Sequence, residues 1–210
     1  MSTLEVGKIV PATGTAITLG ETGDTLTVPS GATLAIASGA TLNATGATQT
    51  GFSSGLTAAS QWRLTTNFTG AAAPIASNLE EVDAPVGFGV LGSSMTESSG
   101  IFTFPSTGYW LIDFHSNCNG TANVFYRNIR IFTTTNNSTY VEAANGYSAI
   151  GISAAGTWYW GADARYIFDV TDTANCKVQF QVQVSGGTVT TVGNTDYNQT
   201  YMTFLRLADT

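Results

Sequence analysis

The stretch GIFTFPSTGYWLIDF, residues 100–114, decides the fold. Apolar side chains recur at every second position, at Phe102 and Phe104 and again at Trp110, Ile112 and Phe114. Between these two runs, Pro105–Gly108 supplies the proline, serine and glycine that tight turns favour. A period of two is typical of a β-strand with one buried face. We therefore predict two consecutive strands, at 100–104 and 109–116, joined by a short turn.

Similar strand patterns recur to the end of the chain, separated by clusters of Gly, Asn and Ser, and no helical periodicity competes with them. Many short strands with such turns indicate a β-sandwich or jelly roll over residues 61–210. In one of them, Val178–Val184, uncharged Gln residues alternate with Val and Phe, which suits a face that meets another subunit or solvent. The further predicted strands are 61–65, 86–90, 124–133, 157–160, 166–170, 177–184 and 201–207.

The order of three segments resembles a known family. These segments are Gly100–Phe114, Tyr166–Phe180 and Asp196–Leu207. They are similar to consecutive and closing strands of the complement-type globular head, a relative of the tumour-necrosis-factor jelly rolls. The resemblance covers roughly residues 60 to 210 and implies a jelly-roll head that forms trimers. The sequence departs from the family pattern at Ala174-Asn175-Cys176, where the family has Gly-Asp, which weakens any inference about a family metal or ligand site.

An octapeptide repeat precedes this part of the chain. Residues 23–46 read GDTLTVPS GATLAIAS GATLNATG, which indicates three short strands separated by turns at Pro29–Gly31 and Ser38–Gly39. One such unit buries too few apolar side chains to offset the entropy lost when its backbone is ordered. Identical segments from other chains could cover the apolar stripe formed by Leu26, Val28, Leu34, Ile36 and Leu42.

We therefore predict a trimeric β-prism or intertwined stalk at 23–46, after an N-terminal anchor at 1–22 and before a neck at 47–60. Two alternatives for the repeat stay open. A flexible tail is one. A Ca²⁺-binding β-roll is the other, but it needs Gly-Gly-x-Gly-x-Asp repeats, and Asp24 stands alone. The predicted fold class is all-β, with this short-strand stalk followed by the jelly-roll β-sandwich head at 61–210.

The composition excludes several classes of function. The chain of 210 residues has seven Lys and Arg and a formal net charge of −7, so it lacks the basic surface that nucleic acid needs. No apolar run approaches the length of a membrane span, and the first residues have no signal-peptide pattern. Cys118 and Cys176 are expected to be reduced, part-buried thiols, although a single bridge is an alternative.

Residues suited to catalysis are sparse. His115, the single histidine, follows Asp113 on one strand face, but no nucleophile motif accompanies them. One histidine and two distant cysteines give no zinc spacing. The acidic cluster Glu80, Glu81 and Asp83 suits a solvated loop better than a Ca²⁺ site. We expect no enzymatic activity, no cofactor and no metal.

Aromatic residues offer the better candidate for binding. Alternation places Trp158 and Trp160 on one strand face and Tyr159 on the other. The two tryptophans fill a core, or they form a ligand platform together with Asp163, Arg165 and Tyr197, a combination typical of sugar recognition.

The start of the chain suggests a biological setting. Residues 1–34, MSTLEVGKIVPATGTAITLGETGDTLTVPSGATL, resemble the leaders of small fibre or appendage proteins of tailed phages, which precede diverse trimeric β heads. The resemblance implies a virion protein assembled in the host cytoplasm and bound to other virion proteins through its N-terminal segment. We expect a homotrimeric fibre or spike that attaches to a host-surface glycan or protein. The alternative is a head fibre or capsid decoration protein with the same fold, and a cell-derived lectin-like or enzymatic jelly roll is a more distant one.

Overall fold

The computed structural model describes residues 25, 27–35, 37–38 and 40, and residues 56–210 except 88, 122–123, 152–154 and 186–187. The chain divides into two compact units, Met1–Gly51 and Phe52–Thr210. The second unit contains all the strands among the described residues and is called the head from here on. Within the described part of the chain, no helix is long and apolar enough to cross a bilayer.

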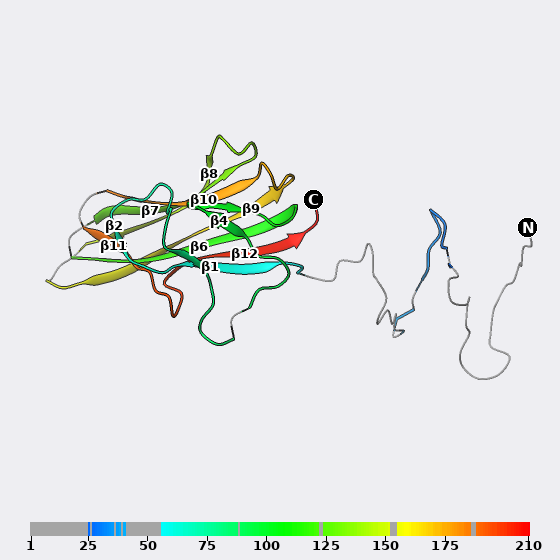
Figure 1. The fold of residues 1–210 in the computed structure, drawn as a ribbon, viewed down its shortest axis with the longest axis horizontal. Helices are drawn as coiled ribbons and strands as arrows, with labels where there is room; N and C mark the ends of the chain where they lie inside the picture. Colours follow the sequence, from blue (N-terminus) through cyan, green and yellow to red (C-terminus); the bar gives the residue numbers. More distant parts are fainter. Residues whose placement is uncertain are drawn as a thin grey trace, which may run out of the picture. The chain divides into compact units, whose positions relative to one another are not determined.

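The strands of the head form two antiparallel sheets (Figure 1). Their bounds are β1 Ala59–Leu64, β2 Phe68–Thr69, β3 Leu79–Glu81, β4 Thr96–Ser98, β5 Ile101–Thr103, β6 Gly108–Gly120, β7 Val124–Thr134, β8 Val141–Ile150, β9 Trp158–Val170, β10 Lys177–Val184, β11 Val189–Thr191 and β12 Thr200–Ala208. The chain crosses between the sheets after β3, β5, β6, β8, β9 and β10, which is the connectivity of a jelly roll. The predicted all-β fold with a jelly-roll head is confirmed.

The long strand β6 organises the seven-stranded sheet. Along one side it pairs with the full length of β9, from Gly108 opposite Val170 to Gly120 opposite Trp158. Along its other side it pairs first with β12 and then with β11. The order β2-β11-β6-β12-β1-β3 completes this sheet. Two strands predicted at 157–160 and 166–170 are therefore one continuous strand.

The five-stranded sheet has the order β4-β5-β10-β7-β8. Its central strand β10 has the predicted bounds of 177–184. Gln179 and Gln181 point away from the core but are only 8% and 9% exposed, because neighbouring groups of the same chain already cover them. Of the three Gln residues predicted to face another subunit or solvent, only Gln183 is exposed.

The core lies between the two sheets and is rich in aromatic rings. Alternation along β6 sends Trp110, Ile112 and Phe114 inward, and each is almost completely buried. Phe180 from the opposing sheet contacts Phe114, with ring centroids 5.0 Å apart. Such ring pairs stabilise a sandwich beyond the area they bury. The core thus fixes which side chains of each strand face outward.

The two ends of the head differ and are named here. At the base, β1 begins, β12 ends and β6 begins, with Ala59 opposite Leu205. At the tip, β6 ends and β9 begins, with Gly120 opposite Trp158, and β7 begins opposite the end of β8. The C-terminus in Figure 1 lies at the base. β1, the first strand of the head, also begins at the base.

The predicted turns of the N-terminal repeat are confirmed, but its packing is not tested. Backbone hydrogen bonds close turns from Pro29 to Ala32 and from Ala37 to Ala40. The described residues among 25–40 form no strand in the single chain, and Val28 and Leu34 are 44% and 63% exposed. The other predicted stalk-core residues, Leu26, Ile36 and Leu42, lie outside the described residues. The oligomeric stalk stays a prediction.

Candidate ligand-binding and assembly surfaces

A polar network crosses the outer face of the seven-stranded sheet. Asp113 on β6 pairs with Arg165 on β9 at 3.0 Å, and Nδ1 of His115 lies 2.7 Å from Asp163. His115 therefore binds Asp163 across the strands and not Asp113, which lies two residues earlier on its own strand. Residues directly opposite on neighbouring strands lie closer together than residues two apart on one strand, so each side chain binds across to β9.

The groups around His115 orient its ring, and the described ones place no nucleophile beside it. Its Nε2 lies 3.1 Å from Oδ1 of Asn117, and its ring lies 5.1 Å from that of Tyr201. Burial, and secondarily the carboxylates of Asp113 and Asp163, raise the pKa of Tyr201. The adjacent hydroxyl, Ser116, points into the core. The described neighbours of His115 thus provide an oriented imidazole without a nucleophile beside it.

The predicted ligand platform is split between two faces of β9. Trp160 points inward and packs beside Cys118, Val124 and Val189. Trp158, two residues earlier, shares its parity and is 37% exposed. Asp163 and Arg165 have the opposite parity and lie on the outer face, bound to β6. The structure therefore does not bring the tryptophans and these two charged residues together, because alternation along an uninterrupted strand separates them.

Tyr197, the remaining predicted ligand residue, lies outside β9. It is 53% exposed in the loop before β12. Oδ1 of Asn194 accepts a hydrogen bond from its backbone N–H at 3.2 Å. The same loop is tied to β1 by a bond from Asn194 N–H to the Leu64 carbonyl. Tyr197 is thus held at a different part of the surface, and whether it binds a ligand stays a prediction.

An exposed aromatic cluster at the tip was missed by the sequence analysis. Phe125 is 89% exposed, Tyr126 is 37% exposed and Tyr147 on β8 is 65% exposed. The rings of Tyr126 and Tyr147 touch edge to face, with centroids 6.2 Å apart. The available signal was the pair Phe125-Tyr126, because consecutive strand residues point to opposite faces and both cannot enter one core.

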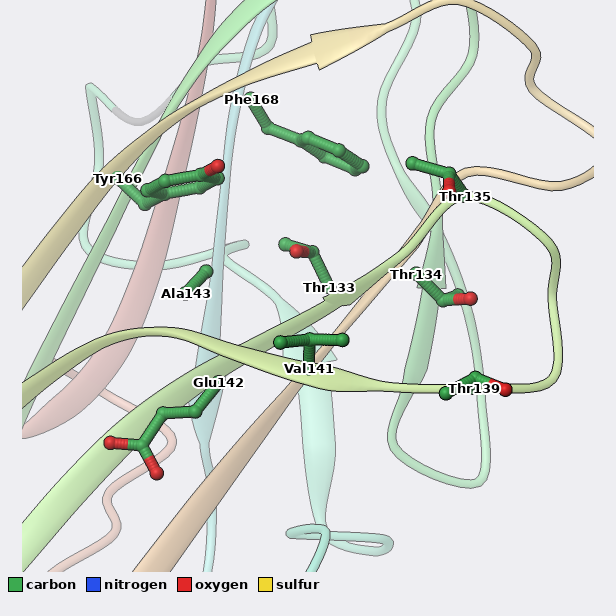
Figure 2. A pocket seen from close by; sticks show the side chains of 9 residues that line it. All are labelled: Thr133, Thr134, Thr135, Thr139, Val141, Glu142, Ala143, Tyr166 and Phe168. Carbon is green, nitrogen blue, oxygen red and sulfur yellow. The ribbon is translucent and has the colours of Figure 1, made fainter.

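A hollow of about 270 Å³ lies between the β7–β8 hairpin and β9. Figure 2 shows the side chains that line it. Tyr166 and Phe168 face Thr133 and Val141 across it, while the carboxylate of Glu142 points away. That carboxylate accepts hydrogen bonds from Arg130 and Asn145. The hollow is slightly smaller than the ~300–1,000 Å³ of typical small-molecule sites. It opens at the base half, beside the exposed Val141.

Arg63 binds two carboxylates of the acidic cluster Glu80, Glu81 and Asp83. Arg63 is fully buried, and its guanidinium binds Glu80 at 2.7 Å and Asp83 at 2.6 Å. Two carboxylates that already bind one buried guanidinium are poor calcium ligands, because the cation would have to displace or oppose that positive charge. Among the residues that the structure describes, no group of three or more His, Cys, Asp or Glu side chains could hold a metal ion.

Both cysteines are buried free thiols, as expected. Burial raises the pKa of Cys118 from 9.0 to about 11, although the nearby Arg127 opposes the shift. Arg127 itself is buried, where desolvation lowers its pKa, and it donates to the carbonyl and hydroxyl of Ser116 and to Thr191. Since a reactive cysteine needs the thiolate form, Cys118 is placed to pack rather than to react.

Exposed aliphatic and aromatic side chains lie mostly at opposite ends of the head. Those at the base are mostly aliphatic and include Leu56, Leu91, Tyr109, Val141, Ile167 and Leu207. Those toward the tip are aromatic and include Phe125, Tyr126, Tyr147, Trp158, Tyr159 and Tyr197. Val86, in the loop after β3, belongs to neither group. Exposed apolar residues that gather in this way mark interaction surfaces.

Known structures share this fold. Eiger TNF from S. frugiperda superposes with a TM-score of 0.54 at 9% identity, over 74% of this chain and 95% of that one. Murine APRIL superposes with a TM-score of 0.50, also at 9% identity, over 71% of this chain and 98% of that one. No protein-family model and no curated sequence matches the chain. The head therefore has a jelly-roll fold like that of tumour necrosis factor, and this likeness establishes the fold alone.

Proposed function

We propose that this protein is a subunit of a homotrimeric phage fibre or spike whose head attaches the virion to the host surface. The observation that carries this proposal is the separation of aliphatic and aromatic exposed residues between base and tip. The base is the end at which β1, the first strand of the head, begins. The tip is the opposite end and presents rings to the surroundings.

Assembly into a trimer is supported by an apolar row at the base. Leu111 on β6 lies opposite Ile167 on β9 and opposite Leu205 on β12, so three aliphatic side chains adjoin on the outer face. Ile167 is 55% exposed in the single chain. A second copy of the chain is the occupant that fits, because the exposed Val28 and Leu34 of the repeat also require neighbouring copies.

The resemblance of residues 1–34 to phage leaders supports placement in a virion, with the N-terminal segment bound to other virion proteins. A head fibre or capsid decoration protein is the second candidate, because stalk and head would be built in the same way. Labelled antibody against the head separates the two placements by electron microscopy of the virion. Label at the tail supports attachment, whereas label on the capsid supports decoration.

Competition for adsorption tests the attachment role. Purified full-length protein should bind host cells and reduce the rate at which the virion adsorbs to them. Protein that binds no cells and leaves adsorption unchanged contradicts the role in attachment. If virions that lack the protein adsorb normally but lose genome on heating, the capsid decoration role replaces it.

A further inference from the structure

The aromatic cluster at the tip is a fixed surface. The register between β7 and β8 shifts between Val124 and Arg127, so β7 carries one extra residue there. This β-bulge lets two consecutive residues, Phe125 and Tyr126, both reach the surface. The backbone of Tyr126 is held by two hydrogen bonds to Ser185, of 3.0 and 2.9 Å. The backbone of Tyr126 is thus held in place, and the contact between its ring and that of Tyr147 orders these two rings before any ligand arrives, which lowers the entropy cost of binding.

Uncharged polar groups adjoin these rings. Asn128 lies opposite Tyr147 on β8 and opposite Gln183 on β10, so the three side chains share the outer face of the five-stranded sheet. Asn128 is only 3% exposed, yet its Oδ1 accepts no hydrogen bond. A buried acceptor without a partner is costly, so a shift of the covering side chains that admits a ligand hydroxyl would remove that cost.

Among the described residues of the head, no lysine or arginine is left unpaired at the surface to bind an anionic ligand. Every lysine and arginine among the described residues of the head is already engaged or buried. Arg63, Arg130, Arg165 and Arg206 form ion pairs, Lys177 donates to the Thr173 carbonyl, and Arg127 is buried against hydroxyl groups. An acidic glycan, phosphate or nucleic acid would therefore have to compete with a carboxylate for an accessible cation such as Arg165.

The size of the cluster fits a small ligand. Aromatic side chains contribute roughly 150–250 Å² each when fully buried, so the exposed parts of Phe125, Tyr126 and Tyr147 amount to roughly 300–500 Å². A stable protein partner needs about 800 Å² on each side. Ring faces flanked by amides suit the apolar C–H face and the hydroxyl groups of a sugar ring.

We propose that Phe125, Tyr126 and Tyr147, with Asn128, form a binding site for an uncharged saccharide unit. This inference rests on the proposed attachment function and names its ligand class. The rings stack on the C–H face of a pyranose, and amide groups of Asn128 and Gln183 bind its hydroxyls. Three tips on one trimer bind repeated sugars of a surface polysaccharide with an avidity that one site alone lacks.

Binding of the labelled full-length protein to immobilised oligosaccharides tests this site. The array carries neutral hexose- and N-acetylhexosamine-terminated oligosaccharides beside sialylated and sulfated ones. We expect binding to neutral members only. Tyr147→Ser and Phe125→Ser should each weaken it by about tenfold or more, because each removes a stacking ring.

Tyr159→Ser is the matched control. Tyr159 is 72% exposed at the same end of the head but on the outer face of the other sheet, so its loss should change binding by less than about twofold. Unchanged thermal unfolding and unchanged native mass in all three variants would show that folding and assembly are intact.

Host-cell binding, measured in parallel, separates the saccharide site from the attachment function. Wild-type protein that binds cells but no neutral saccharide overturns the site while the attachment function stands. Binding to acidic saccharides alone also overturns it, as does neutral binding that survives both ring substitutions. Failure to bind cells as well as saccharides contradicts the attachment function itself.

Discussion

Replacing Ile167 with serine should weaken the trimer without unfolding the head. Ile167 is 55% exposed on the outer face of β9, opposite Leu111 on β6. Complete burial of an isoleucine contributes about 1.5–3 kcal/mol, so burying the remaining half contributes roughly 1–1.5 kcal/mol per copy. Three equivalent copies in a symmetric trimer give roughly 3–4.5 kcal/mol, or about two to three orders of magnitude in the association constant.

Sedimentation over a dilution series measures this effect. The variant should dissociate at concentrations about ten- to thirtyfold above those at which the wild-type trimer dissociates, because the midpoint of a three-chain equilibrium varies with the square root of its constant. Val86→Ser is the control, since Val86 is fully exposed in a loop away from this face and its loss should change nothing. Equal dissociation of the Ile167 variant and wild type would refute the claim that the base of this sheet is an assembly face.

Three further predictions concern the repeat, a buried ion cluster and a buried thiol. Replacing Val28 and Leu34 together with serine should lower the thermal stability of the trimer and leave the unfolding of the isolated head unchanged; an unchanged trimer would count against packing between repeats. Replacing Arg63 with methionine should cost about 1–3 kcal/mol of unfolding free energy in denaturant titration, because Glu80 loses its partner at a part-buried position; a loss below about 0.5 kcal/mol would show that the cluster is not stabilising. Burial raises the pKa of Cys118 from 9.0 to about 11, so the unfolded chain loses this proton first and stability should fall by about 2–3 kcal/mol as the pH rises from 9 to 11. Cys118→Ala should flatten that slope, and a slope that persists in full would assign it to other groups.

Strand prediction succeeded where alternation was regular. β10 has the predicted bounds because Val and Phe alternate strictly with Gln along it. The predicted strand at 86–90 is wrong: Gly87 has a φ of +100°, which an extended strand does not allow. β8 was missed since its sequence VEAANGYSAI has few β-branched residues. A Cβ at Gly146 would lie 2.1 Å from the Asp163 carbonyl oxygen, so close approach to β9 requires this weak strand residue.

The candidate site was less predictable than the fold. Alternation along β9 correctly predicted that Trp158 and Trp160 lie on one face of the strand. The same alternation places Asp163 and Arg165 on the opposite face. The aromatic cluster depends on a β-bulge and on the pairing of β7 with β8, and neither is visible in local sequence periodicity. His115 likewise binds Asp163 because the two residues lie opposite each other on β6 and β9. Contacts of this kind depend on register, which a single sequence specifies only indirectly.

The mass of the protein in native buffer tests the central claim most directly. In the proposed trimer, sister copies cover the apolar row at the base and the exposed residues of the repeat. Light scattering at micromolar concentration should therefore give three times the 21.9 kDa of one chain. A well-folded particle with the mass of a single chain would contradict the account.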